Sequence, residues 1–312
     1  MTVGISLTNG REAIVIADSR QSMQGRESDT GDKLLEVICD VFTGTLITAG
    51  DANIANGLFR ESRSFPHDTI DTYLTAIGSW LKNFVDDVDK RHLTSVREDV
   101  MKKALLVDES IRAQYVDSTL RTALQEYDER RKRNILYNTS FVFCVVEKET
   151  EQVKQYLIEY SGHTELFYPS FTIGSGGDAA NLYFATKLQC VDMATLPVVD
   201  LLFFAINAYN KATVNQGVGG TPKIAVVSKK GTRVLDPKRT VAVANLSGAY
   251  LAGGSRQLTV GNTRNAMGKI LEEESPRYDV IARQMGSDPK TITGIYIPFS
   301  SWQEQANRKF FR

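Results

Sequence analysis

The stretch TVGISLTNGREAIVIADSR, residues 2–20, decides the fold. Two strand-like apolar runs flank the pair Asn9-Gly10, and Asn-Gly in this setting is a strong signal for a tight hairpin turn. We therefore predict that the chain starts in an antiparallel hairpin. Thr2 opens one strand, and Asp18 follows the end of the other.

Two further strand-like runs follow a polar loop. They cover residues 33–38 and 45–49, with a turn at Thr43-Gly44 and an end at Gly50. Four short strands joined by turns favour an antiparallel sheet.

The spacing of apolar residues then changes from the period of a strand to that of a helix. Asp51 is placed to cap a first helix, and residues 68–90 predict a second. A charged stretch over 95–133 predicts a third helix, whose charge run we interpret as a solvated face, with a partner-binding surface as the alternative.

The second half of the chain alternates again between blocks of strands and blocks of helices. Strands are predicted at 140–146, 151–158, 171–173 and 223–227, and helices at 178–190 and 196–213. Segregated blocks of this kind indicate an α+β fold in which helices cover the sheets. Beyond residue 240 we predict a strand over 240–246 and a helical stretch over 263–285.

The composition is that of an ordinary globular chain of 312 residues, 42% hydrophobic and 24% charged. Lys plus Arg and Asp plus Glu both count 37, so the net charge of zero indicates neither a nucleic-acid nor a membrane partner. No apolar run approaches the ~20 residues of a membrane span. The N-terminus carries no basic-then-apolar leader, so we expect a cytoplasmic location.

Cysteine and histidine give no sign of a metal centre. Cys39, Cys144 and Cys190 are scattered without a C-x-x-C pair, and we expect buried free thiols. The three histidines are isolated, which disfavours a histidine metal site and a Ser-His-Asp triad. We expect neither a metal nor an organic cofactor.

Thr2 has the chemistry of an N-terminal nucleophile. Removal of Met1 is favoured by the small side chain that follows, and it would leave a hydroxyl and a free amine on one residue. An α-amine titrates near pH ~7.7–8.0, so a useful fraction is unprotonated and acts as a base. The plainer interpretation is that Thr2 is merely the first residue of a strand.

Asp18 and Lys33 are the polar residues that support the nucleophile interpretation. Lys33 opens the strand after the hairpin, and neighbouring strands would bring it beside Thr2 with Asp18 as its partner. A nearby ammonium stabilises a developing alkoxide and lowers the pKa of the amine. An ordinary surface ion pair is the alternative on spacing alone.

Several short stretches, taken together, resemble the proteasome β subunits and their relatives, the HslV peptidase and the bacterial Anbu proteins. The resemblance covers residues 2–59, including Lys33-Leu34-Leu35 and Thr48-Ala49-Gly50, and resumes at 173–177 and 217–227. The Thr, the Asp-x-Arg, the Lys and the Ala-Gly occur in the order of that family. The resemblance implies a four-layer αββα sandwich of two antiparallel sheets between helix layers.

The resemblance also implies a role for each site residue. Thr2 would be the nucleophile, Lys33 its electrostatic activator and Asp18 the group that orients Lys33. The backbone N–H of Gly50 would face the oxyanion, and Ser175 would position a water and the amine. Arg20, Gly176 and Asn215 are the supporting residues.

The chain departs from the family pattern in two ways, by substitutions at two site positions and by added segments. Asn215 and Val218 stand where β subunits usually have an aspartate and a serine, which weakens the network around Ser175. We expect a proteasome-like domain over 2–238 with a helical insertion within 60–138, and a C-terminal extension over 239–312 packed on the same domain.

The function that this implies is that of a threonine peptidase. It would cleave peptides or unfolded proteins through a Thr2 acyl-enzyme, within a self-compartmentalising homo-oligomer that an unfoldase or regulatory partner could serve. Two alternatives stay open. The acyl group could pass to an amine, as in transpeptidases or ligases of the connectase type, or the chain could be a non-catalytic assembly subunit.

Overall fold

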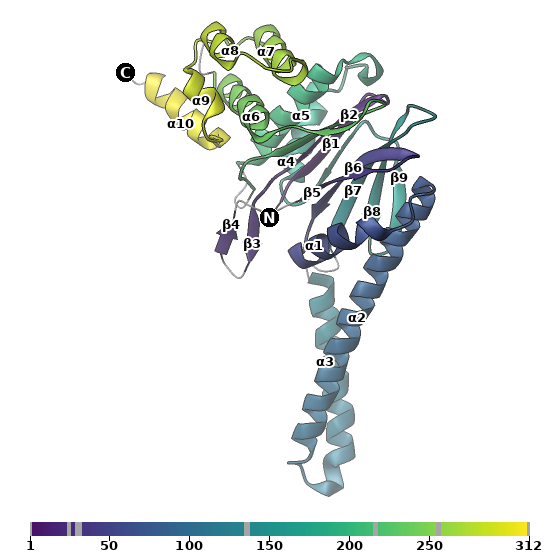
Figure 1. Ribbon diagram of the computed structural model, residues 1–312. Coiled ribbons are helices and arrows are strands. Elements are labelled where there is room, and N and C mark those ends of the chain that lie inside the picture. Colours follow the sequence, from purple (N-terminus) through teal and green to yellow (C-terminus); the bar gives the residue numbers. More distant parts are fainter. Residues whose placement is uncertain are drawn as a thin grey trace.

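The computed structural model describes residues 2–23, 26–28, 33–133, 138–214, 218–253 and 257–310. Within these residues the chain folds as α+β, with two five-stranded antiparallel sheets stacked face to face and helices on both outer faces (Figure 1). The predicted fold class, a four-layer sandwich, is therefore confirmed.

The first sheet contains the hairpin of residues 2–20. Its strand order is β10-β1-β2-β11-β12, and neighbouring strands run antiparallel. The pairing of Gly4 with Ala17 sets the hairpin register and brings Asp18 opposite Val3. The strands are β1 (Gly4–Thr8), β2 (Glu12–Ala17), β10 (Ser170–Ile173), β11 (Lys223–Ser228) and β12 (Gly231–Val234).

The second sheet lies against the first across an apolar layer. Its order is β5-β6-β7-β8-β9, with β5 (Leu34–Ile38), β6 (Phe42–Ala49), β7 (Ser140–Glu147), β8 (Val153–Glu159) and β9 (Gly162–Leu166). The layer between the sheets is made mainly of alanine, valine and isoleucine, including Ala13, Val15, Ile47, Val142 and Ala225. A separate small hairpin is formed by β3 (Gln21–Met23) and β4 (Arg26–Ser28).

Helices cover the outer face of each sheet. On the first sheet lie α4 (Gly177–Lys187) and α5 (Val198–Ala212), with the short helix η2 (Met193–Thr195) between them in sequence. On the second sheet lie α1 (Ala52–Glu61), the short helix η1 (Ser62–Ser64) and the first turns of α2 (Ile70–Ala104). Asp51 caps α1, as predicted, by accepting hydrogen bonds from the amides of Asn53 and Ile54.

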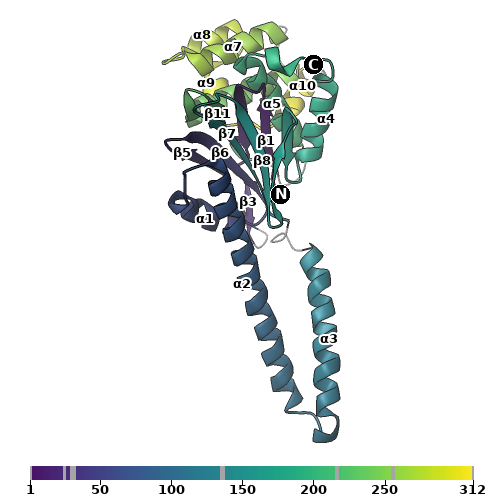
Figure 2. The same ribbon diagram turned by 90° about the vertical axis from the view of Figure 1, so that its right-hand side faces the viewer.

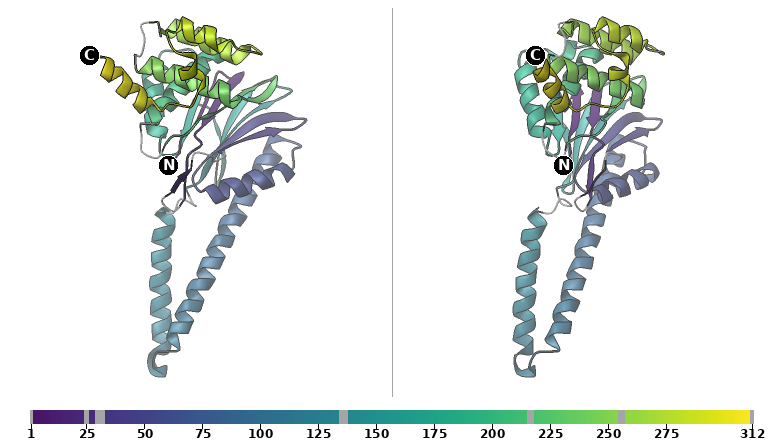
Figure 3. Two further views of the ribbon diagram at one scale, coloured as in Figure 1. Left: turned by 60° about the vertical axis from the view of Figure 1, so that its left-hand side comes forward. Right: turned by 90° about the vertical axis from the view of Figure 1, so that its left-hand side faces the viewer.

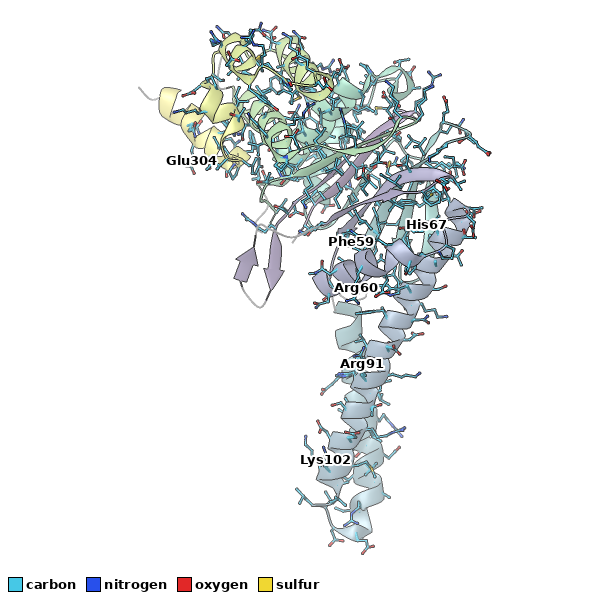
Figure 4. The ribbon with its side chains drawn as sticks, in the orientation of Figure 1. Phe59, Arg60, His67, Arg91, Lys102 and Glu304 are labelled. Atoms are coloured by element: carbon cyan, nitrogen blue, oxygen red, sulfur yellow. The ribbon has the colours of Figure 1, made fainter. Side chains whose placement is uncertain are left out.

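A long helical hairpin projects from one end of the sandwich. It is made of α2, which has 35 residues, and α3 (Glu109–Arg133), and we call it the arm (Figures 1 and 2). Along α2 a run of buried residues ends at Val85, and side chains such as Arg91 and Lys102 point outward (Figure 4). The prediction of separate helices over 68–90 and 95–133 is wrong, because α2 continues unbroken to Ala104.

The C-terminal region forms a further helical layer on α5 (Figure 3). It consists of α6 (Pro237–Leu251), α7 (Val260–Glu272), α8 (Tyr278–Gln284), α9 (Pro289–Thr293) and α10 (Phe299–Phe310). The predicted strand over 240–246 is wrong, since this stretch is the middle of α6. Residues 240–249 are all buried among α5 and the other C-terminal helices, so no polar face marks the helical period.

Two smaller points concern the cysteines and the membrane. Cys144 is buried in β7, but Cys39 is half-buried and Cys190 is exposed beyond the end of α4, so the prediction of buried thiols is wrong for Cys190. In the part of the chain that the structure describes, no helix combines the length and the apolar character that a membrane span requires.

Candidate active site

The N-terminal end of the chain lies at the end of the sandwich from which the arm projects (Figures 1 and 2), and Thr2 comes two residues before β1. Its side chain belongs to the buried part of the molecule. The backbone nitrogen of Thr2 donates a hydrogen bond of 3.3 Å to Oγ of Ser175, and its carbonyl accepts one of 3.1 Å from the amide of Gly176. The loop after β10 therefore holds the backbone of Thr2 on both sides.

The hairpin register fixes Asp18 opposite Val3, the residue next to Thr2. The amide of Asp18 donates to the carbonyl of Val3 at 3.1 Å, and its carboxylate Oδ1 accepts from the amide of Val3 at 3.1 Å. The side chain is almost fully buried. The short turn at Asn9-Gly10 sets this register, so the sequence of the hairpin determines where the carboxylate lies.

Lys33 reaches the same point from the second sheet. It directly precedes β5, and its carbonyl accepts a hydrogen bond of 3.1 Å from the amide of Thr48. Its ammonium donates to Oγ1 of Thr2, to Oδ1 of Asp18 at 2.9 Å and to the carbonyl of Arg20. An ammonium has three hydrogens, so these acceptors use its full capacity and leave it one orientation.

Burial shifts the pKa of both Lys33 and Asp18 in the direction that favours the neutral form. Desolvation lowers the pKa of Lys33, and the neighbouring Asp18 carboxylate opposes that shift. Desolvation likewise raises the pKa of Asp18, and Lys33 opposes it. The Asp18 carboxylate favours the charged ammonium, which is the form of Lys33 that can stabilise negative charge on Oγ1 of Thr2.

Gly50 ends β6 in a conformation that disfavours a side chain. Its φ is +130°, and a Cβ there would run into Thr139, which is buried. The hydroxyl of Thr139 also accepts a hydrogen bond of 2.8 Å from the amide of Asp51. The Ala49-Gly50 corner is close to Thr2, because a Cβ on Gly174 would touch the Thr2 carbonyl and lie 3.3 Å from Cβ of Ala49.

Gly174 and Thr139 are two residues of the site that the sequence interpretation missed. In the glycine-rich motif after β10 the sequence indicates Ser175 and Gly176, yet Gly174 packs directly on the Thr2 carbonyl with a φ of +85°. Two glycines around a serine are the available signal for such a close approach. Thr139 carries no such signal, since only the pairing of β6 with β7 brings it beside Gly50.

Of the supporting residues, Arg20 contributes two backbone hydrogen bonds to the site. Its carbonyl receives Lys33, and its amide donates to the carbonyl of Gly219 at 3.2 Å. Val218 is buried, and one of its methyl groups lies 3.0 Å from the position that a Cβ on Gly176 would take. Asn215 lies outside the described residues.

Comparison with known proteins finds likeness at the level of structure. No protein-family model matches the sequence, and no curated protein matches it. The structure is similar to that of Anbu (ancestral beta-subunit) from Yersinia bercovieri, with 12% identity and a TM-score of 0.50 over 74% of this chain and 86% of that chain. It is also similar to an Anbu (Gly-1) mutant from Hyphomicrobium sp. strain MC1, with 13% identity and a TM-score of 0.43 over 76% and 85% of the two chains.

The first of these structures establishes the fold. It confirms that the chain has the proteasome-like sandwich that the resemblance in its sequence implied. At 12% identity the likeness extends to the fold alone, so the chemistry has to be argued from the residues of this site.

Proposed function

We propose that this chain, which has the proteasome-like fold of Anbu, is an N-terminal threonine hydrolase that cleaves amide bonds through Thr2. One observation carries the proposal. A buried lysine ammonium donates simultaneously to the hydroxyl of Thr2 and to the carboxylate of Asp18. A structural ion pair needs no hydroxyl as a third partner, whereas an activated nucleophile does.

The first step is attack by the Thr2 hydroxyl. Once Met1 has been removed, the nitrogen that lies 3.3 Å from Oγ of Ser175 is a free amine, and it takes the hydroxyl proton directly or through a water beside Ser175. Lys33 stabilises the negative charge that develops on Oγ1. The new bond joins Oγ1 to the carbonyl carbon of the substrate.

The acyl-enzyme follows from collapse of the tetrahedral intermediate. The Gly50 N–H, at the corner beside Thr2, is the proposed donor to the oxyanion. The C–N bond of the substrate breaks, the leaving amine takes the proton held by the Thr2 amine, and an ester on Oγ1 remains. Water then attacks the ester, releases the acid and returns the proton to Oγ1.

The proposed substrate is a peptide or an unfolded protein, processed within an assembly of several copies of this chain. Support for an assembly comes from the fold, because the similar Yersinia bercovieri protein is described as a beta-subunit.

Covalent labelling tests the proposal. The protein is incubated with a peptide β-lactone, which acylates an activated hydroxyl, and the adduct is located by peptide mapping. We expect one acyl group on Thr2, lost in Thr2→Ala and retained in Thr2→Ser. Labelling that is as strong in Thr2→Ala as in the wild type contradicts the proposal, and so does a Thr2 that is free at its N-terminus and stays unlabelled.

A further inference from the structure

Tyr209 is a tyrosine at a position where packing alone requires only a phenylalanine. It lies on α5 in the core between that helix and the first sheet, and it is fully buried. Its hydroxyl donates a hydrogen bond of 3.0 Å to the carbonyl of Gly220. A buried hydroxyl costs free energy unless it is paired. This hydrogen bond pairs the Tyr209 hydroxyl with the segment that leads into β11.

The same segment also contacts Arg20, through Gly219, the residue next to Gly220. The carbonyl of Gly219 accepts a hydrogen bond of 3.2 Å from the amide of Arg20. The guanidinium carbon of Arg20 lies 3.0 Å from the position that a Cβ on Gly219 would take, so a side chain there would displace it. The pair Gly219-Gly220 therefore connects Arg20 to Tyr209.

Arg20 in turn supports the ammonium of Lys33. Its carbonyl is one of the acceptors that fix this group, beside the hydroxyl of Thr2 and the carboxylate of Asp18. The position of the Arg20 carbonyl thus helps to set the direction in which the ammonium points at Thr2. The backbone of Arg20 therefore lies between the glycine pair and the ammonium that contacts the nucleophile.

The C-terminal region braces Tyr209 from behind. The rings of Tyr209 and Tyr296 lie 6.3 Å apart, and the Tyr296 hydroxyl donates to Oδ1 of Asn210 at 3.1 Å. Asn245 of α6 ties down the segment that carries Tyr296. Its side chain donates to the carbonyls of Thr291, Ile292 and Ile295 and accepts from the amide of Ile297 at 2.9 Å.

We propose that Tyr209 is a positioning residue for Lys33, acting through the glycine pair Gly219-Gly220 and the backbone of Arg20. Tyr296 holds Tyr209 in place, so the C-terminal helices support the site rather than merely cover the sandwich. The catalytic consequence rests on the proposed function, whereas the structural connection from Tyr209 to Arg20 does not.

The test compares Tyr209→Phe with a matched control, Tyr183→Phe. Tyr183 lies buried on α4 in the same core, where its ring packs edge to face on Phe184. The first measurement is β-lactone labelling of Thr2 at several concentrations, which separates the inactivation rate constant from the affinity for the reagent. The second is hydrogen exchange of the Arg20 amide, followed by NMR, which does not depend on activity.

We expect Tyr209→Phe to lower the inactivation rate constant on the order of tenfold with unchanged affinity, because a small displacement of a catalytic group costs rate rather than binding. The Arg20 amide exchanges faster in the same variant. Tyr296→Phe has a smaller effect in the same direction, and Tyr183→Phe leaves both measurements at the wild-type values.

Three outcomes overturn the inference. An Arg20 exchange rate unchanged in Tyr209→Phe removes the structural connection, whatever the activity. Wild-type labelling kinetics in Tyr209→Phe removes the positioning role while leaving the proposed function intact. Equal effects in Tyr183→Phe indicate general loosening of the core. If wild-type Thr2 is never labelled, the proposed function fails, and Arg20 exchange alone decides on the connection.

Discussion

Lys33 Nζ lies 2.9 Å from Asp18 Oδ1, and the two side chains are only 8% and 0% exposed. A buried pair of this kind gains little stability over apolar residues of similar volume, because both charges lose their hydration. Its presence is therefore better explained by the third contact of the lysine, with the Thr2 hydroxyl.

Replacing Lys33 by methionine separates its contribution to stability from its contribution to the reactivity of Thr2. Lys33→Met keeps the length and apolar stem of the side chain, and we expect Thr2 labelling to fall to background. The variant also loses about 3–5 kcal/mol of stability, since the Asp18 carboxylate is left buried without its partner. Circular dichroism and chemical denaturation check folding alongside the labelling. A folded Lys33→Met that labels at the wild-type rate contradicts the role of the lysine.

The control for that variant removes both charges. Asp18→Asn combined with Lys33→Met leaves no unpaired charge, so it should recover most of the lost stability and none of the labelling. Recovery of labelling together with stability would show that Lys33→Met had acted through the fold alone.

The same double variant is the reference for a prediction on pH. Burial depresses the pKa of Lys33 below its usual 10.5, so the unfolded chain binds the proton more tightly than the folded one. The unfolding free energy of the wild type, relative to the double variant, should therefore rise with pH between the folded pKa and 10.5. Denaturation curves from pH 7 upward measure this difference; a relative stability that falls over that window contradicts the assignment.

Gly174 offers a sharp test of how Thr2 is held. Gly174→Ala places a Cβ against the Thr2 carbonyl, and we expect labelling to fall roughly a hundredfold because the nucleophile is displaced. Gly253→Ala is the matched control. Gly253 has a φ of +67°, positive like the +85° of Gly174, but no atom lies within 4 Å of its Cβ position.

Both alanine variants pay a similar cost for the positive φ, about 1 kcal/mol or more. Only Gly174→Ala should affect the labelling rate beyond this loss of stability. Equal labelling in the two variants would mean that backbone strain, and not contact with Thr2, governs the position.

The arm is expected to be dispensable for the chemistry of Thr2. A run of buried residues along α2 ends at Val85, and the hydroxyl of Tyr127 bonds to the side chain of Asp89, so the two helices meet at that level. Replacing residues 90–126 by a short Gly-Ser linker should leave the melting temperature and the labelling rate near wild-type values. Loss of labelling in a folded variant would instead make the arm a part of the site.

A core substitution provides the contrast for the shortened arm. Leu81 lies on α2 within the apolar cluster under the second sheet. Leu81→Ala should cost about 2–5 kcal/mol through the cavity that it leaves. The comparison shows whether the assay detects damage to α2 where the helix is part of the core.

The local features of the fold were predictable because their signals are local. The Asn9-Gly10 turn and the Asp51 cap each depend on a few adjacent residues, and the structure has both. The sequence of the helix α6 predicts a strand because the helix is buried on all sides, which erases the helical period. The full length of α2 leaves no apolar stripe in the sequence, because most of its side chains between Val85 and Val100 are exposed.

The residues of the candidate site likewise divide into those that the sequence indicates and those that only the folded structure brings together. Thr2, Asp18 and Lys33 could be named from their order along the chain, and the structure brings them within hydrogen-bonding distance. Thr139 and Tyr209 were out of reach, because their contacts depend on the pairing of β6 with β7 and on the packing of α5 against the segment before β11. Such contacts between distant parts of the chain leave no pattern in the sequence around them.

The most direct test of the central claim is the product formed with a peptide epoxyketone. This reagent closes a ring only with a hydroxyl and a free amine on the same residue, so its adduct reports both groups of an N-terminal threonine. We predict one cyclic adduct on an N-terminal peptide that begins at Thr2, measured by mass spectrometry. An N-terminal peptide that retains Met1 and carries no adduct, or an adduct on any other residue, would contradict the assignment of Thr2 as the nucleophile.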